Sequence, residues 1–147
     1  MSNKNKAISF FASGFNCAQS ILKTYGPELS LDEDSCSRIA APFGAGMGVM
    51  QKTCGAVTGS FMVIGLKCNM TEGDDSESKD RAYSLTREFT DKFIKKNKTI
   101  NCRELIGCDI TTDDGLQNAM DENIFSTLCV KYIKDASAII EEILCIQ

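Results

Sequence analysis

The sequence predicts an all-α fold, and three observations lead to this prediction. Apolar residues recur at three- and four-residue steps over most of the chain, which is the spacing of amphipathic helices. No stretch shows the sustained alternation of apolar and polar residues that is typical of a half-buried strand. The chain has 147 residues, of which 43% are hydrophobic, and this suits one domain of ordinary size. We therefore expect residues 1–147 to form a single-domain bundle of about five or six helices.

The expected helices follow one another along the chain with short breaks. The first covers residues 4–25 and ends at Gly26 and Pro27. A glycine-rich loop precedes an apolar central helix, for which we expect Thr53 as the N-cap and Cys54 in the first turn. The other elements are a short helix at 32–40, the glycine-rich loop at 43–50, an amphipathic helix at 79–96, a helical turn at 101–107, an acidic loop at 109–115 and a last helix at 122–144.

The composition excludes several classes of function. The chain has no histidine, which excludes Ser-His-Asp and Cys-His catalysis, histidine-held zinc and histidine-ligated haem. A net charge of −4 argues against nucleic acid and anionic membranes as partners. The most apolar window, residues 56–66, is shorter than the roughly 17 to 25 residues that a membrane span needs. We expect no nucleic-acid partner and no membrane insertion.

Eight cysteines stand out in this composition. The apolar stretch at residues 7–15 is interrupted by Ser9, Ser13 and Gly14, and no cleavage site follows it, so we expect a cytoplasmic protein with reduced thiols. An excess of cysteine in that compartment indicates metal binding or redox chemistry, although buried thiols also serve as small hydrophobic side chains. Because the chain has no C-x-x-C pair, a site with several cysteines must be assembled from distant segments.

Cys54 is the strongest single candidate for a reactive thiol. A thiol in the first turn of a helix faces free backbone N–H groups, which favour the thiolate and lower the pKa. Lys52 adds positive potential nearby. The alternative is a buried Cys54 beside a tight helix contact, because Gly55, Gly59 and Ser60 are small enough to let another backbone approach. Both interpretations remain open on local chemistry.

Three motifs and a further cysteine together resemble a known family. The core is Cys54-Gly55-Ala56-Val57-Thr58-Gly59, which follows Phe43-Gly44-Ala45-Gly46-Met47-Gly48. An N-C-A-Q motif begins at Asn16, an N-C-R-E-L motif begins at Asn101, and Cys129 lies in the expected last helix. Over nearly the whole chain this pattern resembles the C_GCAxxG_C_C family, small proteins described as redox-active.

The resemblance implies a division of the cysteines into two sets. Cys17, Cys54, Cys102 and Cys129 would be the functional quartet. The N-C-R-E-L match favours Cys102 over Cys108 as the third member. The peripheral set would be Cys36, Cys68, Cys108 and Cys145.

Three alternative functions are consistent with these four cysteines. The leading hypothesis is a thiol-dependent oxidoreductase in which Cys54 is the nucleophile and Cys17, Cys102 or Cys129 resolves it as a disulfide, with an unidentified electron donor or acceptor as partner. The second is a binding or electron-transfer module in which the same four thiols hold an iron–sulfur cluster or a zinc ion. The third is a non-catalytic helical oligomer, such as a homodimer, with core cysteines. The sequence names neither the substrate nor the metal, and it leaves enzymatic activity open.

Overall fold

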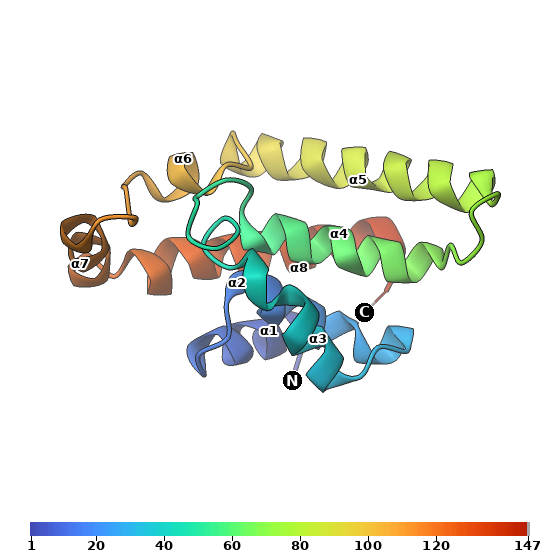
Figure 1. Cartoon of the computed structure of the whole chain (residues 1–147), viewed down its shortest axis with the longest axis horizontal. Helices are drawn as coiled ribbons and strands as arrows, with labels where there is room; N and C mark the ends of the chain where they lie inside the picture. Colours follow the sequence, from blue (N-terminus) through green and yellow to red (C-terminus); the bar gives the residue numbers. More distant parts are fainter. Residues whose placement is uncertain (147) are drawn as a thin grey trace.

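The computed structural model describes residues 1–146, and within them eight α-helices form and no β-sheet does. The central helix α4 (Gly55–Cys68) packs against α2 (Cys17–Tyr25), α5 (Ser76–Asn97) and α8 (Val130–Leu144). In Figure 1, α5 runs along one side of α4 and the N-terminal helices lie on the other. The predicted all-α class is confirmed, and the helices outnumber the five or six expected.

The N-terminal segment contains two helices, so the single helix expected over residues 4–25 is wrong. Helix α1 (Asn3–Ala12) ends before Gly14, whose φ of 111° lies outside the helical region. Asn16 then starts α2: its side chain accepts a hydrogen bond from the Gln19 amide, and the Gln19 side chain accepts one from the Asn16 amide, at 2.9 and 3.0 Å. This capping box makes Cys17 the first residue of a helix.

Helix α3 (Glu33–Ala40) overturns another expectation. It lies between the 3₁₀ turns η1 (Pro27–Leu29) and η2 (Ala41–Phe43). Cys36 is completely buried, although its neighbours in sequence are polar and we expected a peripheral position. Its Sγ lies against Gly26, where an added Cβ would be only 2.5 Å away. Cys36 is therefore a packing residue of the core.

The loop between α3 and α4 has an unusual backbone. Residues 45–49 all have positive φ, between 52° and 68°, and thus form a left-handed turn. Backbone hydrogen bonds hold the turn, including Gln51 N–H to the Ala45 carbonyl at 3.1 Å and Lys52 N–H to the Gly46 carbonyl at 2.9 Å. Left-handed φ costs about 1–2 kcal/mol for a non-glycine residue, and Val49 is β-branched. The surrounding hydrogen bonds stabilise this strained turn beside the start of α4.

The C-terminal third also departs from the prediction. Helix α6 (Cys102–Ile106) forms at the expected place, but α7 (Asp113–Asp121) begins inside the expected acidic loop because Thr112 caps it. The last helix is preceded by a π-helical turn, η3 (Phe125–Cys129). No helix within residues 1–146 combines the length and the apolar character that a membrane crossing requires.

Candidate functional site

A short backbone pairing brings two of the predicted cysteines together. Thr53 and Asn101 form an isolated antiparallel bridge. On either side of it, the Cys54 amide donates to the Ile100 carbonyl at 2.8 Å and the Cys102 amide donates to the Lys52 carbonyl at 2.6 Å. Cys54 and Cys102 therefore flank the same bridge.

Two glycines of the central motif bring Cys17 to the same place. A Cβ added at Gly55 would lie 3.1 Å from the Cys17 Cβ, and one added at Gly59 would lie 2.8 Å from the Ala18 carbonyl oxygen. At Gly59 a side chain would clash with the backbone of α2, and at Gly55 it would make a tight contact, so both glycines help α2 to lie close to the start of α4. The expectation that small residues admit another backbone here is confirmed.

The fourth cysteine comes from the C-terminal region. Cys129 is the last residue of η3, and π-helical turns occur often at functional sites. In the next turn, the Tyr132 hydroxyl donates to the Leu105 carbonyl at 2.6 Å. This hydrogen bond joins α8 to α6 and so holds Cys129 near Cys102.

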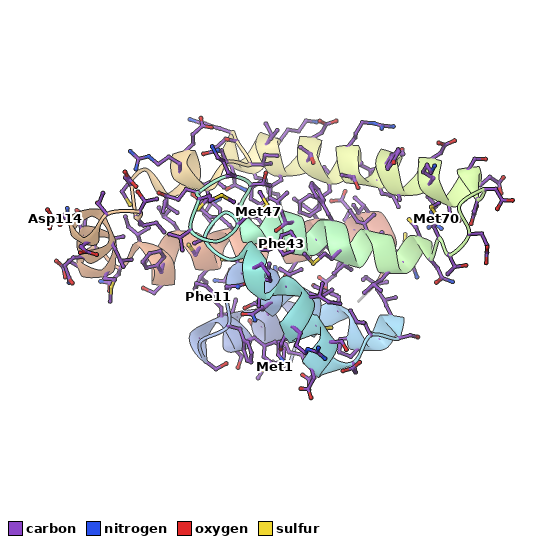
Figure 2. The ribbon with its side chains drawn as sticks, in the orientation of Figure 1. Met1, Phe11, Phe43, Met47, Met70 and Asp114 are labelled. Atoms are coloured by element: carbon purple, nitrogen blue, oxygen red, sulfur yellow. The ribbon has the colours of Figure 1, made fainter. Side chains whose placement is uncertain are left out.

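All four predicted cysteines line one cavity of about 320 Å³. Cys108 does not line it, so the geometry favours Cys102 of the two candidates for the third position. In Figure 2, Phe11, which also lines the cavity, lies below the loop that carries Met47. The rest of the lining is mainly apolar: Phe15, Ala45, Leu105, Ile106, Ile110 and Phe125, with Gly14, Asn16, Gly46, Gly55 and Tyr132.

The environment of Cys54 contradicts its expected activation. Cys54 is itself the N-cap of α4, in place of Thr53, and is only 5% exposed. Burial raises the pKa of its thiol to about 12, although the amides of Ala56 and Val57 act in the opposite direction. Burial likewise raises the pKa of Cys102, to about 11, and the nearby Cys129 adds to that increase. At these two helix starts the helix dipole lowers the thiol pKa by less than the desolvation of the thiolate raises it.

Cys17 and Cys129 behave as a pair. Their side chains interact, and this contact raises the pKa of Cys17 well above its ordinary value and lowers the pKa of Cys129. Of the two, Cys17 therefore holds its proton more tightly and Cys129 ionises more readily. Cys17 is partly exposed and Cys129 is 9% exposed. All eight cysteines are free, and in the described part of the chain no three His, Cys, Asp or Glu side chains are placed to hold a metal ion.

One residue of the site was not anticipated. Gln51 is buried, its Nε2 donates to the Cys108 carbonyl at 2.9 Å, and its Oε1 accepts from the Ile110 amide at 2.9 Å. Its side chain also interacts with the Cys102 thiol and opposes the rise in pKa there. Gln51 has a φ of 54° and belongs to no helix, so hydrophobic periodicity could not predict its burial. Its position directly after the glycine-rich loop is the one feature of the sequence that points to it.

The fold and the cavity define the class of this protein. It is an all-α domain in which cysteines from four segments line one cavity. A family model described as "Putative redox-active protein (C_GCAxxG_C_C)" matches residues 15–143, and the chain belongs to this family. The matched range includes all four cavity cysteines, and it confirms the resemblance seen in the sequence. Neither the comparison with curated proteins nor that with solved structures found a match.

Proposed function

We propose that this protein is a thiol-based oxidoreductase whose Cys17 and Cys129 cycle between a dithiol and a disulfide. The observation that carries the proposal is the convergence of thiols from four separate segments on one cavity. Within that group, Cys17 and Cys129 interact through their side chains. Membership of a family described as redox-active agrees with this use of the thiols.

The chemistry assigns a different role to each cysteine. Cys129, with its lowered pKa, is the nucleophile, in place of the Cys54 that the sequence suggested. Cys129 loses its proton to become the attacking thiolate, and Cys17 gives up its proton as the S–S bond forms, so that the dithiol passes two electrons and two protons in total to an acceptor. Cys54 and Cys102 stay protonated at neutral pH because burial raises their pKa, and they form part of the cavity wall. A reducing compartment such as the cytoplasm suits this cycle, because its thiol pool regenerates the dithiol.

Disulfide mapping tests the proposal. The reduced protein is treated with one equivalent of diamide, alkylated, digested without reductant and analysed by peptide mass spectrometry. We expect a Cys17–Cys129 crosslink as the main product, which Cys17→Ser and Cys129→Ser abolish. Cys145→Ser is the matched control, because Cys145 is exposed and does not line the cavity. A dominant Cys54–Cys102 crosslink, or no intramolecular disulfide, would overturn the assignment.

A four-thiolate site for an iron–sulfur cluster or a zinc ion is the second candidate. It is favoured by the electrostatics: Cys54, Cys102 and Cys129 each raise the pKa of at least one other cavity thiol, so a bound cation would relieve the repulsion between their thiolates. Four thiolates also suit zinc and cluster chemistry. Within residues 1–146 the side chains are not arranged as metal ligands, and all eight thiols are free, so neither state is already formed. The dithiol ranks first because the side chains of Cys17 and Cys129 interact.

Metal reconstitution separates the two candidates. Reduced protein is incubated with zinc, or with iron and sulfide, then desalted and assayed for bound metal and for cluster absorption. Stoichiometric metal that is lost in each of the four cysteine-to-serine variants would replace the dithiol proposal. Metal content that stays below stoichiometry and does not respond to these variants would exclude the metal site.

A further inference from the structure

The cavity offers a ligand few polar groups apart from its thiols. No charged side chain lines it. The Tyr132 hydroxyl is already bonded to the Leu105 carbonyl, and the Asn16 side chain is bonded to the Ala41 carbonyl and the Gln19 amide. A charged or strongly polar molecule would lose its hydration here without new hydrogen bonds to replace it. The occupant must therefore be uncharged and mostly apolar.

The walls and the volume of the cavity restrict the size of the ligand that it can hold. Phe11, Phe15 and Phe125 come from three different segments and are each only partly buried, so their rings form apolar walls that reach the surface. The volume of about 320 Å³ is at the lower end of the range of about 300–1,000 Å³ for ligand pockets. A one- or two-ring molecule fits this space, whereas a dinucleotide or a folded peptide is too large.

We propose that the cavity binds a small uncharged quinone that accepts the electrons of the Cys17–Cys129 dithiol. This inference rests on the redox function proposed above. Two S–H bonds break, one S–S bond forms, and each quinone oxygen gains a hydrogen, so that one quinone and one dithiol become one hydroquinone and one disulfide. Both thiols line the cavity together with the aromatic rings, which places the acceptor beside its electron donors.

A tryptophan reporter tests binding directly, because the chain contains no tryptophan. Phe125→Trp places the reporter in the cavity wall, and Tyr83→Trp places it on exposed α5 as the matched control. The probe is tetramethyl-1,4-benzoquinone, whose fully substituted ring prevents addition of thiols. We expect saturable quenching for Phe125→Trp and only a linear, collisional decrease for Tyr83→Trp.

Electron transfer is followed in the same samples. We expect one hydroquinone for each Cys17–Cys129 disulfide. The double variant Cys17→Ser/Cys129→Ser in the Phe125→Trp background should still bind the quinone without reducing it.

Absence of saturable quenching, while diamide still forms the disulfide, would overturn the quinone proposal and leave the redox function standing. Saturable binding with no disulfide from either oxidant would overturn the redox function and the electron-transfer step with it. Binding and reduction of diphenyl disulfide in preference to the quinone would overturn the choice of acceptor.

Discussion

The cysteine-lined cavity and the aromatic core show two different ways of positioning side chains. In the core, Phe61, Phe89 and Phe93 lie in the middle of helices and pack ring against ring, with centroids 5.9 and 6.0 Å apart. In the cavity, every cysteine lies at the end of an element: Cys17 begins α2, Cys54 caps α4, Cys102 begins α6 and Cys129 ends η3. Helix periodicity builds the core, whereas helix ends and loop backbone build the site.

The largest expected effect is in the aromatic core. Phe93 is fully buried and contacts the rings of Phe89 and Tyr132. Phe93→Ala should lower the free energy of unfolding by about 3–5 kcal/mol, because it removes buried surface and leaves a cavity. Phe125→Ala, in the half-buried wall of the cysteine cavity, should cost clearly less. Urea unfolding measures both, and equal losses would show that the two regions do not differ in packing.

The contact between α2 and α4 links the two regions. Gly59→Val should cost about 1–3 kcal/mol, because its Cβ would lie 2.8 Å from a backbone oxygen of Ala18 that cannot move alone. Gly65→Ala, on the exposed side of the same helix, meets nothing within 4 Å. It should be neutral or slightly stabilising because alanine has the higher helix propensity. Thermal unfolding compares the two variants, and a tolerated Gly59→Val would show that the close contact is not needed.

Cys36 and Cys145 should differ in how much stability they lose on replacement by serine. Cys36→Ser should cost about 1–3 kcal/mol, because a smaller and more polar hydroxyl replaces a buried sulfur that packs against Gly26, with only the Leu31 carbonyl as a possible acceptor. Cys145→Ser should change stability by less than about 0.5 kcal/mol, because Cys145 is exposed. The measurement is urea unfolding of the reduced proteins. A neutral Cys36→Ser would return Cys36 to the peripheral set.

Alkaline pH should destabilise the reduced protein through its buried thiols. The pKa of Cys54 rises from an ordinary 9.0 to about 12 on folding, so its contribution to stability is complete below pH 9 and is lost progressively as the pH rises toward the folded value. The loss for this one group is about 1.4 kcal/mol per pH unit within that window. Cys54→Ala should flatten the decline in stability above pH 9, measured by urea unfolding at several pH values. An unchanged slope would contradict the burial of an un-ionised thiol.

The sequence predicted the regular part of the molecule well. The amphipathic helix expected at 79–96 corresponds to α5, whose Phe89 and Phe93 are fully buried, and the motifs identified four cysteines that line one cavity. The break at Gly14 was missed because apolar spacing continues across it, and the π-helical turn was missed because the pattern fits a continuous helix.

The chemistry of the individual thiols could not be predicted in the same way. Local sequence suggested an activated Cys54, whereas its ionisation depends on burial by distant segments. Cys36 has polar neighbours, but with Ala40 it forms the buried face of α3, which becomes apparent only when α3 is packed. A helix terminus can be recognised in a sequence, whereas the degree of desolvation of a side chain is a tertiary property.

Timed alkylation of the four cavity cysteines tests the central claim most directly. The reduced, metal-free protein is treated with iodoacetamide at several pH values, and the labelling rate at each cysteine is measured by peptide mass spectrometry. The contact with Cys17 lowers the pKa of Cys129, while burial raises that of Cys54, so Cys129 should react first of the four and Cys54 should be among the slowest. Cys17→Ala should slow labelling of Cys129 at neutral pH, because it removes the thiol that stabilises the thiolate. If Cys54 reacts first and Cys129 does not respond to Cys17→Ala, the assignment of Cys17 and Cys129 as the redox pair is wrong.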